Sequence, residues 1–357
     1  MHLVFLVYDV HFGGGVERVT ANMTNYLVRA NHQVTIVSLS RIKPSNIFTI
    51  DDRVSIEYLN FHFENSFNLL QKIASVFRVS KYLGRYTQQT VVLGFGTYPS
   101  LILAMMPRRK NLKTIGCQHS SYAFAEHAWA FLRKIFFHRL NALVSLTVYD
   151  LPKLKKLNNN SFVIPNSVSF FAERPSQLEN KLLLAIGRMD YNKGYDLLLD
   201  VFEKLAISYP DWRLRIIGDG PLKEKIISRI KNSGLNNQIE ILLPTDQIMN
   251  QYLQASVYLM TSRKEGLPMV LLEAQACGLP IVSFNCETGP SDIIIDNENG
   301  FLINCFDIEN MVQRISQLCS DYELRTKFGK NAVKNVEKFR PEVINPMWEE
   351  LFQKIVQ

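Results

Sequence analysis

Short apolar runs alternate with amphipathic stretches along most of the chain. Residues 3–8 (LVFLVY) are apolar, a glycine-rich turn follows at 13–15, residues 16–30 repeat apolar positions at helical spacing, and QVTIVSL comes next. This order of strand, loop, helix and strand is typical of the start of a doubly wound α/β domain. Further strands are predicted at 54–59, 90–95, 112–117, 142–147 and 161–165. Their alternation with helical stretches predicts a parallel sheet.

A second α/β series begins after a polar stretch at 166–180. Its predicted strands are 181–188, 212–217, 239–243, 255–260 and 280–284, and its predicted helices are 195–207, 222–231, 269–277, 308–320 and 322–338. We therefore expect two Rossmann-like domains, residues 1–168 and 169–340, facing a cleft. A last helix over 341–357 carries Trp348 and Phe352 and is expected to return to the first domain. Ligands of such sheets bind beyond the carboxyl ends of the strands, so the loops there are the places to look for chemistry.

Composition adds a charge asymmetry to this picture. The 357 residues are 47% hydrophobic and 20% charged, which is ordinary for a soluble globular protein. Residues 1–165 contain 19 Lys and Arg against 8 Asp and Glu, whereas the remainder is net acidic. A basic first domain favours an anionic partner, either nucleic acid or an acidic membrane surface. Five cysteines without a CxxC pair, and a start lacking the features of a signal peptide, favour reduced thiols and a cytoplasmic protein.

Two basic, aromatic-rich stretches, 67–86 and 124–140, have two interpretations. Helices of this composition can lie on an anionic bilayer. Alternatively, their apolar side chains face the core while the cations face water.

The segment RKEGLPMVLLEA (263–274) follows a predicted strand and opens a predicted helix. Gly266 permits a tight turn, and Pro268 suits the first helical turn. The start of this helix would present free N–H groups and a positive dipole end to an anion. Glu265 and Glu273 would then bind sugar hydroxyls near that anion. The alternative leaves Glu265 as a helix-start acid and Glu273 as a solvated helix residue.

Three further loops follow predicted strands. In GRMDYNKG (187–194), Arg188 and Lys193 are placed to hold one pair of phosphates, unless both are solvated loop cations. The Gly13–Gly15 loop does not match the dinucleotide fingerprint, because Arg18 stands where the third glycine is needed. We interpret this loop as a backbone nest that can closely approach a phosphate or a sugar. His119 in QHSS follows the strand at 112–117, although a lone histidine is more often structural. No ligand spacing for a metal ion is present, so no metal site is expected.

Taken together, these segments resemble the retaining glycosyltransferases of family 4, which have the GT-B fold. The resemblance covers nearly the whole chain and is closest to bacterial enzymes that build O-antigen, capsule or exopolysaccharide. Its motifs, in order, are GGGVER, QHSS, IPNSV, AIGRMDYNKG, IIGDGP, EGLPMVLLEAQACGLPIVS and ETGPSDIIIDNENGFLI.

The resemblance implies roles for the matching residues. Arg188 and Lys193 would hold the donor diphosphate and neutralise the leaving nucleotide, Glu273 would bind the ribose hydroxyls, and Glu265 would bind the donor sugar. His119 would sit by the transferring sugar. The remaining donor contacts would come from the backbone or side chains of Gly14, Gly15, Leu243, Gly266, Leu267, Pro268 and Met269. The chain departs from the family pattern at Leu243–Thr245, where a Leu-Gly pair is frequent, and at Glu287–Gly289, where a Gly pair is common.

The implied function is transfer of a hexose or N-acetylhexosamine from a UDP-sugar to an undecaprenyl-diphosphate-linked or other glycan acceptor. The resemblance further implies retention of configuration, no metal or other cofactor, no nucleic-acid partner, and a location on the inner face of the cytoplasmic membrane. Three alternatives stay open: another GT-B nucleotide-sugar enzyme such as a hydrolase or epimerase, a non-catalytic basic binding protein, and a nicotinamide enzyme, the last weakened by Arg18.

Overall fold

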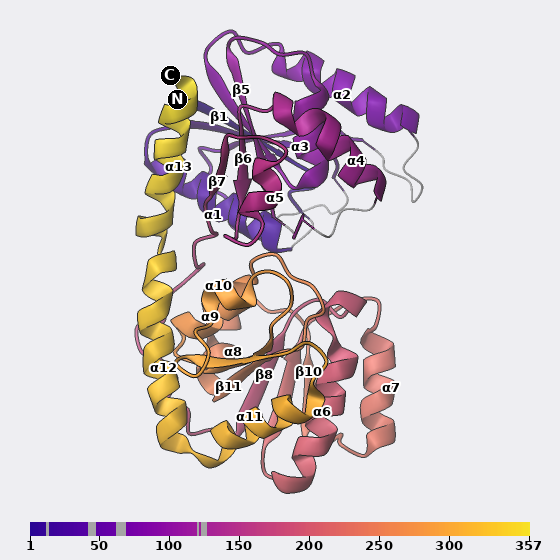
Figure 1. The fold of residues 1–357 in the computed structure, drawn as a ribbon, viewed down its shortest axis with the longest axis vertical. Helices are drawn as coiled ribbons and strands as arrows, with labels where there is room; N and C mark the ends of the chain where they lie inside the picture. Colours follow the sequence, from indigo (N-terminus) through magenta and orange to yellow (C-terminus); the bar gives the residue numbers. More distant parts are fainter. Residues whose placement is uncertain (12–13, 42–47, 62–68, 120, 123–126) are drawn as a thin grey trace. The chain divides into compact units, whose positions relative to one another are not determined.

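A computed structural model describes residues 1–11, 14–41, 48–61, 69–119, 121–122 and 127–357 (Figure 1). The chain divides into two compact units. Unit 1 comprises Met1–Ser167 with Pro341–Gln357, and unit 2 comprises Val168–Arg340. The division lies one residue from the boundary expected from the sequence, and the last helix belongs to unit 1.

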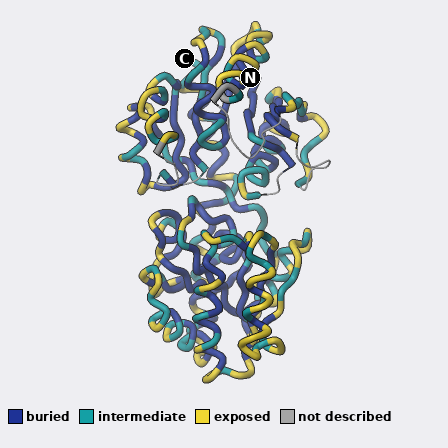
Figure 2. Tube along the Cα trace, turned by 90° about the vertical axis from the view of Figure 1, so that its right-hand side faces the viewer, coloured by how far each residue is buried: buried dark blue, intermediate teal, exposed yellow. Residues whose placement is uncertain are grey.

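Unit 1 is built on a sheet of seven parallel strands in the order β3-β2-β1-β4-β5-β6-β7. The strands are β1 (His2–Val7), β2 (Gln33–Ser38), β3 (Ser55–Tyr58), β4 (Thr90–Phe95), β5 (Leu112–Gln118), β6 (Ala142–Ser145) and β7 (Ser161–Val163). Every residue of β1 and β4 is buried, as expected for strands covered on both faces (Figure 2). All seven coincide with strands predicted from apolar runs, so the α/β class of this unit is confirmed.

Helices cover both faces of this sheet. One face carries α1 (Gly15–Arg29) and α13 (Pro341–Val356), and the buried Trp348 and Phe352 of α13 pack there with Leu3 and Phe5 of β1. Each such aromatic side chain contributes about 1.5–3 kcal/mol when fully buried, which attaches the distant end of the chain to unit 1. The other face carries α2 (Leu69–Leu83), α3 (Thr97–Met105), α4 (His127–Phe136) and α5 (Leu151–Lys155).

Unit 2 repeats the architecture with six parallel strands in the order β10-β9-β8-β11-β12-β13. The strands are β8 (Leu182–Ile186), β9 (Arg213–Ile217), β10 (Ile239–Leu242), β11 (Val257–Met260), β12 (Ile281–Phe284) and β13 (Gly300–Ile303). The hydrophobic core on one face includes residues of α6 (Tyr195–Ser208), α7 (Lys223–Ser233) and α11 (Ile308–Ser320). The short helix α8 (Ile248–Gln254) contacts β8, and α9 (Met269–Ala276) contacts β12 and α12 (Tyr322–Val336).

Some elements of unit 2 differ from the prediction. The sequence predicts no strand at β13, where only Phe301–Ile303 form an apolar run after a polar stretch, and no helix at α8, whose seven residues are too few to establish a period. The helix predicted over 322–338 ends at Val336 and continues as a single 3₁₀ turn, Glu337–Phe339. Across the described residues, no helix combines the length and the apolar composition that crossing a membrane requires.

Candidate active site

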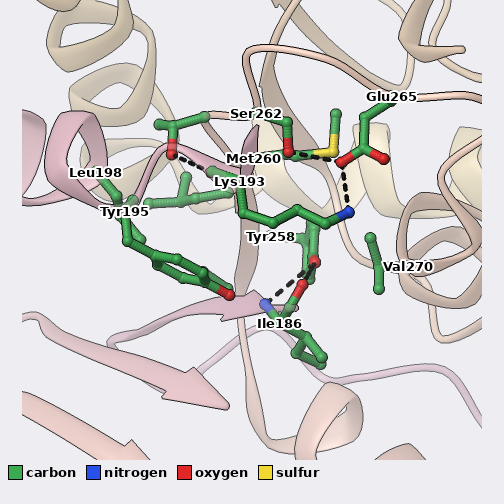
Figure 3. Close-up of a pocket in the computed structure, with 12 residues that line it drawn as sticks. Ile186, Lys193, Tyr195, Leu198, Tyr258, Met260, Ser262, Glu265 and Val270 are labelled. Carbon is green, nitrogen blue, oxygen red and sulfur yellow. Dashed lines mark hydrogen bonds and ion pairs between the residues drawn. The ribbon is translucent and has the colours of Figure 1, made fainter. Parts of the chain in front are cut away.

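The strand order of unit 2 places a crevice between β8 and β11. These strands are neighbours although two other strands lie between them in the sequence, so the connections run in opposite directions on either side of them. Crevices at the carboxyl ends of strands at such a reversal are the usual ligand sites of open α/β sheets. A small pocket, with room for about one water molecule, lies there, lined by the ends of β8 and β11, the loops that follow, and the starts of α6 and α9 (Figure 3).

Two loops form the rim of this pocket and are bonded to each other. After β8, the side chain of Asp190 accepts hydrogen bonds from the backbone N–H groups of Asn192 and Lys193 at 2.9 and 3.2 Å, which fixes the 3₁₀ turn Tyr191–Lys193. Gly194 then adopts φ = +65° and leads into α6, and its carbonyl accepts from Thr261 Oγ1 after β11 at 2.9 Å. The two loops therefore hold a defined relative position.

Lys193 and Glu265 meet at this rim. The Lys193 Nζ donates to Glu265 Oε1 at 2.6 Å, and the Ser262 hydroxyl donates to the same oxygen at 2.6 Å (Figure 3). The carboxylate is nearly buried, whereas the lysine retains some exposure toward the pocket. Charge-assisted hydrogen bonds of this length are strong, and the arrangement gives the pocket one cation and one carboxylate acceptor side by side. Lys193 is therefore a paired and only partly exposed residue, and the interpretation of it as a solvated loop cation is wrong.

Glu273 lies inside α9 and is 1% exposed. The Tyr252 hydroxyl of α8 donates to its Oε2 at 3.0 Å. Glu273 is therefore not a solvated helix residue, as one interpretation of the sequence held. It does not line the pocket that holds Lys193 and Glu265, although Val270 of the same helix does.

The other donor-site candidates of unit 2 flank this pocket. The Arg188 side chain is about half exposed, and its Nε lies 3.8 Å from Asp190 Oδ2. Leu243 follows β10 and is exposed, whereas the side chains of Leu267 and Met269 are buried. Pro268 occupies the N-cap of α9, one residue before the first helical turn in which the sequence places it, and Gly266–Pro268 lead into the helix start. Arg188 and Lys193 thus lie on one loop, but only Lys193 lines the pocket.

Gly194 is a position where the backbone tolerates no side chain. A Cβ there would lie 2.1 Å from the Thr261 carbonyl oxygen, whereas a Cβ at Gly234, also left-handed at φ = +74°, has no atom within 4 Å. We expect Gly194→Ala to lower the free energy of unfolding by about 2–4 kcal/mol, and Gly234→Ala by only about 1 kcal/mol. Urea unfolding of both variants measures this, and equal losses would contradict the contact with Thr261.

His119 lies directly after β5 in unit 1. Its ring stacks on Phe95 with 4.5 Å between ring centroids, and both ring nitrogens are buried without a hydrogen-bond partner among the described residues. Burial lowers the pKa of His119 to about 4, so the imidazole is neutral at pH 7. A buried nitrogen without a partner costs free energy, so a new hydrogen bond to this ring would be favourable.

The lowered pKa of His119 predicts a pH dependence of stability. In the unfolded chain this group titrates near 6.5, so the unfolded state binds more protons than the folded state between about pH 6.5 and 4. Stability is then fully present above pH 6.5 and falls as the pH drops. Between pH 7 and pH 5 the free energy of unfolding, measured with urea, should fall by about 2 kcal/mol less in His119→Gln than in wild type, because glutamine does not titrate. Identical losses would contradict a buried neutral imidazole.

The glycine loop of unit 1 is partly described, since Gly13 lies outside the described residues. Gly14 is the N-cap of α1, and its N–H donates to Glu17 Oε2 at 2.8 Å. Burial raises the pKa of the Glu17 carboxyl. Gly15 is exposed, and no described atom lies within 4 Å of the place a Cβ would take. The backbone at Gly15 is therefore open to a close approach, as a nest near a helix start requires.

Sequence reasoning missed two partners in the site. Ser262 stands three residues before Glu265, and this spacing usually indicates a helix cap. Here the Ser262 hydroxyl donates a hydrogen bond to the Glu265 carboxylate instead. Tyr252 lies on α8, which had no periodic signal of its own. Among the residues that the structure describes, no group of three or more His, Cys, Asp or Glu side chains is placed to hold a metal ion.

Known protein families match most of this chain. Residues 13–169 match the family model described as Glycosyltransferase Family 4, and residues 169–335 match the one described as Glycosyl transferases group 1. The amylovoran biosynthesis glycosyltransferase AmsD of Erwinia amylovora is 29% identical over 359 residues, which is 98% of this chain and 99% of AmsD. An alpha-1,4-N-acetyl-D-galactosaminyltransferase of Campylobacter jejuni, whose full name includes a saccharide on PP-undecaprenol, is 26% identical over 99% of both chains.

A solved structure has the same fold. TarM of S. aureus, crystallised with UDP among its ligands, superimposes with a TM-score of 0.82 over 99% of this chain and 100% of its own. The two sequences are 19% identical, so the likeness is one of fold.

Proposed function

This chain belongs to the family-4 glycosyltransferases of the GT-B fold, and from that premise we propose that it transfers a hexose or N-acetylhexosamine from a UDP-sugar to a lipid-diphosphate-linked saccharide in surface-polysaccharide biosynthesis. The single observation that carries the proposal is the pocket between β8 and β11, where Lys193 and Glu265 meet at 2.6 Å. A cation for a phosphate and a carboxylate for sugar hydroxyls lie side by side there, which is the pairing that a sugar diphosphate needs.

Lys193 and Glu265 would change their hydrogen-bond partners when the donor binds. In the structure, Lys193 pairs with Glu265, whose Oε1 also accepts from Ser262. When a diphosphate binds at the rim of this small pocket, Lys193 turns to the phosphate, and Glu265 keeps its hydrogen bond from Ser262 and accepts hydrogen bonds from the sugar. Arg188, half exposed on the same loop, and the N–H groups at the start of α9 add positive potential. These groups stabilise the charge that develops as the nucleotide leaves, so we propose that catalysis needs no metal ion.

The transfer step would retain the anomeric configuration. The bond from the anomeric carbon to the phosphate oxygen breaks, and the acceptor hydroxyl oxygen forms the new bond on the same face. The acceptor's proton passes to the departing phosphate oxygen, so no protein base takes part. His119, neutral and with both ring nitrogens unpartnered among the described residues, would hydrogen-bond the transferring sugar and not act as a general acid.

Relatives and charge support the proposed acceptor and location. The Campylobacter jejuni relative's name includes a PP-undecaprenol-linked saccharide, and residues 1–165 of this chain hold 19 Lys and Arg against 8 Asp and Glu. We therefore place the enzyme on the cytoplasmic face of the membrane, where a lipid-linked acceptor would be found.

A thermal-shift panel of nucleotide sugars followed by product analysis tests this function. The right UDP-sugar should raise the melting temperature by mass action, and product should form only when a lipid-diphosphate saccharide is added. Analysis of the product anomer tests retention, and EDTA should leave the rate unchanged. Fast hydrolysis or epimerisation of the UDP-sugar alone would identify a different GT-B enzyme, and a panel without any shift would reject the donor site.

A further inference from the structure

Arg263 joins the two loops that form the rim of the pocket between β8 and β11. It belongs to the loop after β11, and its backbone N–H donates to the Asn192 carbonyl at 2.7 Å. Its guanidinium donates to both carboxylate oxygens of Asp196, in the first turn of α6, at 2.8 and 2.6 Å. The same guanidinium donates to the Tyr191 carbonyl at 2.9 Å. The loop after β11 is therefore bonded to residues on both sides of Lys193.

The Tyr191 ring completes this contact. The guanidinium carbon of Arg263 lies 4.2 Å from the centre of the ring. The arginine side chain is only 12% exposed, although that of Asp196 is about half exposed. An ordinary ion pair at the surface contributes little, whereas a two-pronged contact between arginine and carboxylate that also stacks on a ring has a fixed geometry. We call Arg263, Asp196 and Tyr191 the loop clamp.

The loop clamp is separate from the pair of Lys193 and Glu265. None of its three side chains is among the described residues that line the pocket. In the proposed function, Lys193 leaves Glu265 for the donor phosphate, so the direct bond between the two loops is lost when both side chains must stay in position. The loop clamp, together with the hydrogen bond from Thr261 to the Gly194 carbonyl, would then keep the two loops in place.

We propose that Arg263 is a positioning residue for the transfer reaction. Through the loop clamp it keeps Lys193 within reach of the donor diphosphate while Glu265 binds the sugar, and it acts through Lys193 without touching the donor. Misplacement of a reacting group by about 1 Å can lower the rate about a hundredfold. This inference rests on the proposed function, because it names what holds the two pocket residues in place during transfer.

Hydrogen exchange of the full chain tests the clamp without any substrate. In Arg263→Ala, the backbone amides of Asn192 and Lys193 should exchange about tenfold faster than in wild type, because their turn loses its contact with the loop after β11. Arg229→Ala is the matched control. Arg229 pairs with two other carboxylates of α6 at 2.6 and 2.8 Å, and the hydrogen bonds that the structure gives it all end on α6. This variant should exchange like wild type at the turn.

Turnover separates a positioning role from a structural one. Arg263→Ala should lower kcat about ten- to a hundredfold, with a smaller change in KM for the UDP-sugar. Arg263→Lys keeps the charge but not the two-pronged contact, so it should recover only part of the rate. In a Lys193→Ala background, the substitution of Arg263 should have almost no further effect, because the clamp acts through Lys193.

The outcomes keep the clamp and the proposed function apart. Unchanged exchange at the turn in Arg263→Ala would overturn the clamp, and losses of kcat that multiply with those of Lys193→Ala would overturn the positioning role. If Arg263→Ala melts early, Asp196→Asn serves in its place and should show the same pattern more weakly. Wild type without turnover on any UDP-sugar would reject the proposed function and the positioning role with it, whereas faster exchange in Arg263→Ala would still establish the clamp.

Discussion

Replacing Lys193 with alanine is expected to lower kcat for sugar transfer by about a hundred- to a thousandfold, which is the usual cost of removing one preorganised group that stabilises developing negative charge. Lys193 is the charged donor in the pocket between β8 and β11, and its Nζ lies 2.6 Å from Glu265. The charge on the leaving nucleotide grows during the reaction, so the loss should appear in kcat and not only in KM. Initial rates with saturating donor and acceptor measure it.

Two further variants separate catalysis from structure. Lys204→Ala removes a lysine whose Nζ also lies 2.6 Å from a carboxylate, that of Glu309, but this pair is exposed to solvent on α6 and α11, and its loss should leave turnover unchanged. Lys193→Arg keeps the charge and should recover part of the rate. Wild-type turnover in Lys193→Ala would show that the lysine takes no part in the mechanism. It would also contradict the proposed change of hydrogen-bond partner from Glu265 to the donor phosphate.

The pairing of Lys193 with Glu265 marks the limit of what sequence alone predicts. Both residues stand out because each follows an apolar run and precedes a helix. Their contact spans 72 positions and depends on β8 and β11 being neighbours, although β9 and β10 lie between them in the sequence. An apolar pattern locates the carboxyl end of a strand, but the strand's neighbours follow from the packing of the whole sheet. The same reason explains why Tyr252 could not be identified as the partner of Glu273.

The amphipathic stretches of unit 1 illustrate a second limit. Their sequences fit helices on a membrane and helices on a core equally well, and in the structure α2 has both buried and exposed apolar side chains. Val79 and Leu83 of α2 are buried, whereas Phe77 of the same helix is 70% exposed. Helical spacing predicts which residues share a side of the helix, but when apolar residues occupy more than one side it does not predict which side faces the sheet.

Replacing Glu273 with alanine is expected to raise KM for the UDP-sugar by about ten- to a hundredfold with a smaller change in kcat. The resemblance implies that Glu273 binds the ribose hydroxyls. A hydrogen bond to a charged group contributes about 1.5–3 kcal/mol and these hydroxyls would be bound equally before and during transfer, so loss of the carboxylate would weaken uniform binding. The fold should survive, because the Tyr252 hydroxyl, which donates to Glu273, also lies 3.3 Å from the Val270 carbonyl and keeps an acceptor. Tyr252→Phe is the matched control, since it keeps the carboxylate and should raise KM only a few-fold.

A UDP-sugar that lacks one ribose hydroxyl tests directly whether Glu273 binds the ribose. The 2′-deoxy analogue of the UDP-sugar should bind wild type about tenfold or more weakly than the parent, because Glu273 then lacks one hydroxyl donor. In Glu273→Ala the same change in the donor should have almost no further effect, so the two losses together should fall well short of their sum, as expected for groups in direct contact. Fully additive losses would place Glu273 away from the ribose and leave its burial beside Tyr252 as a structural feature of unit 2 alone.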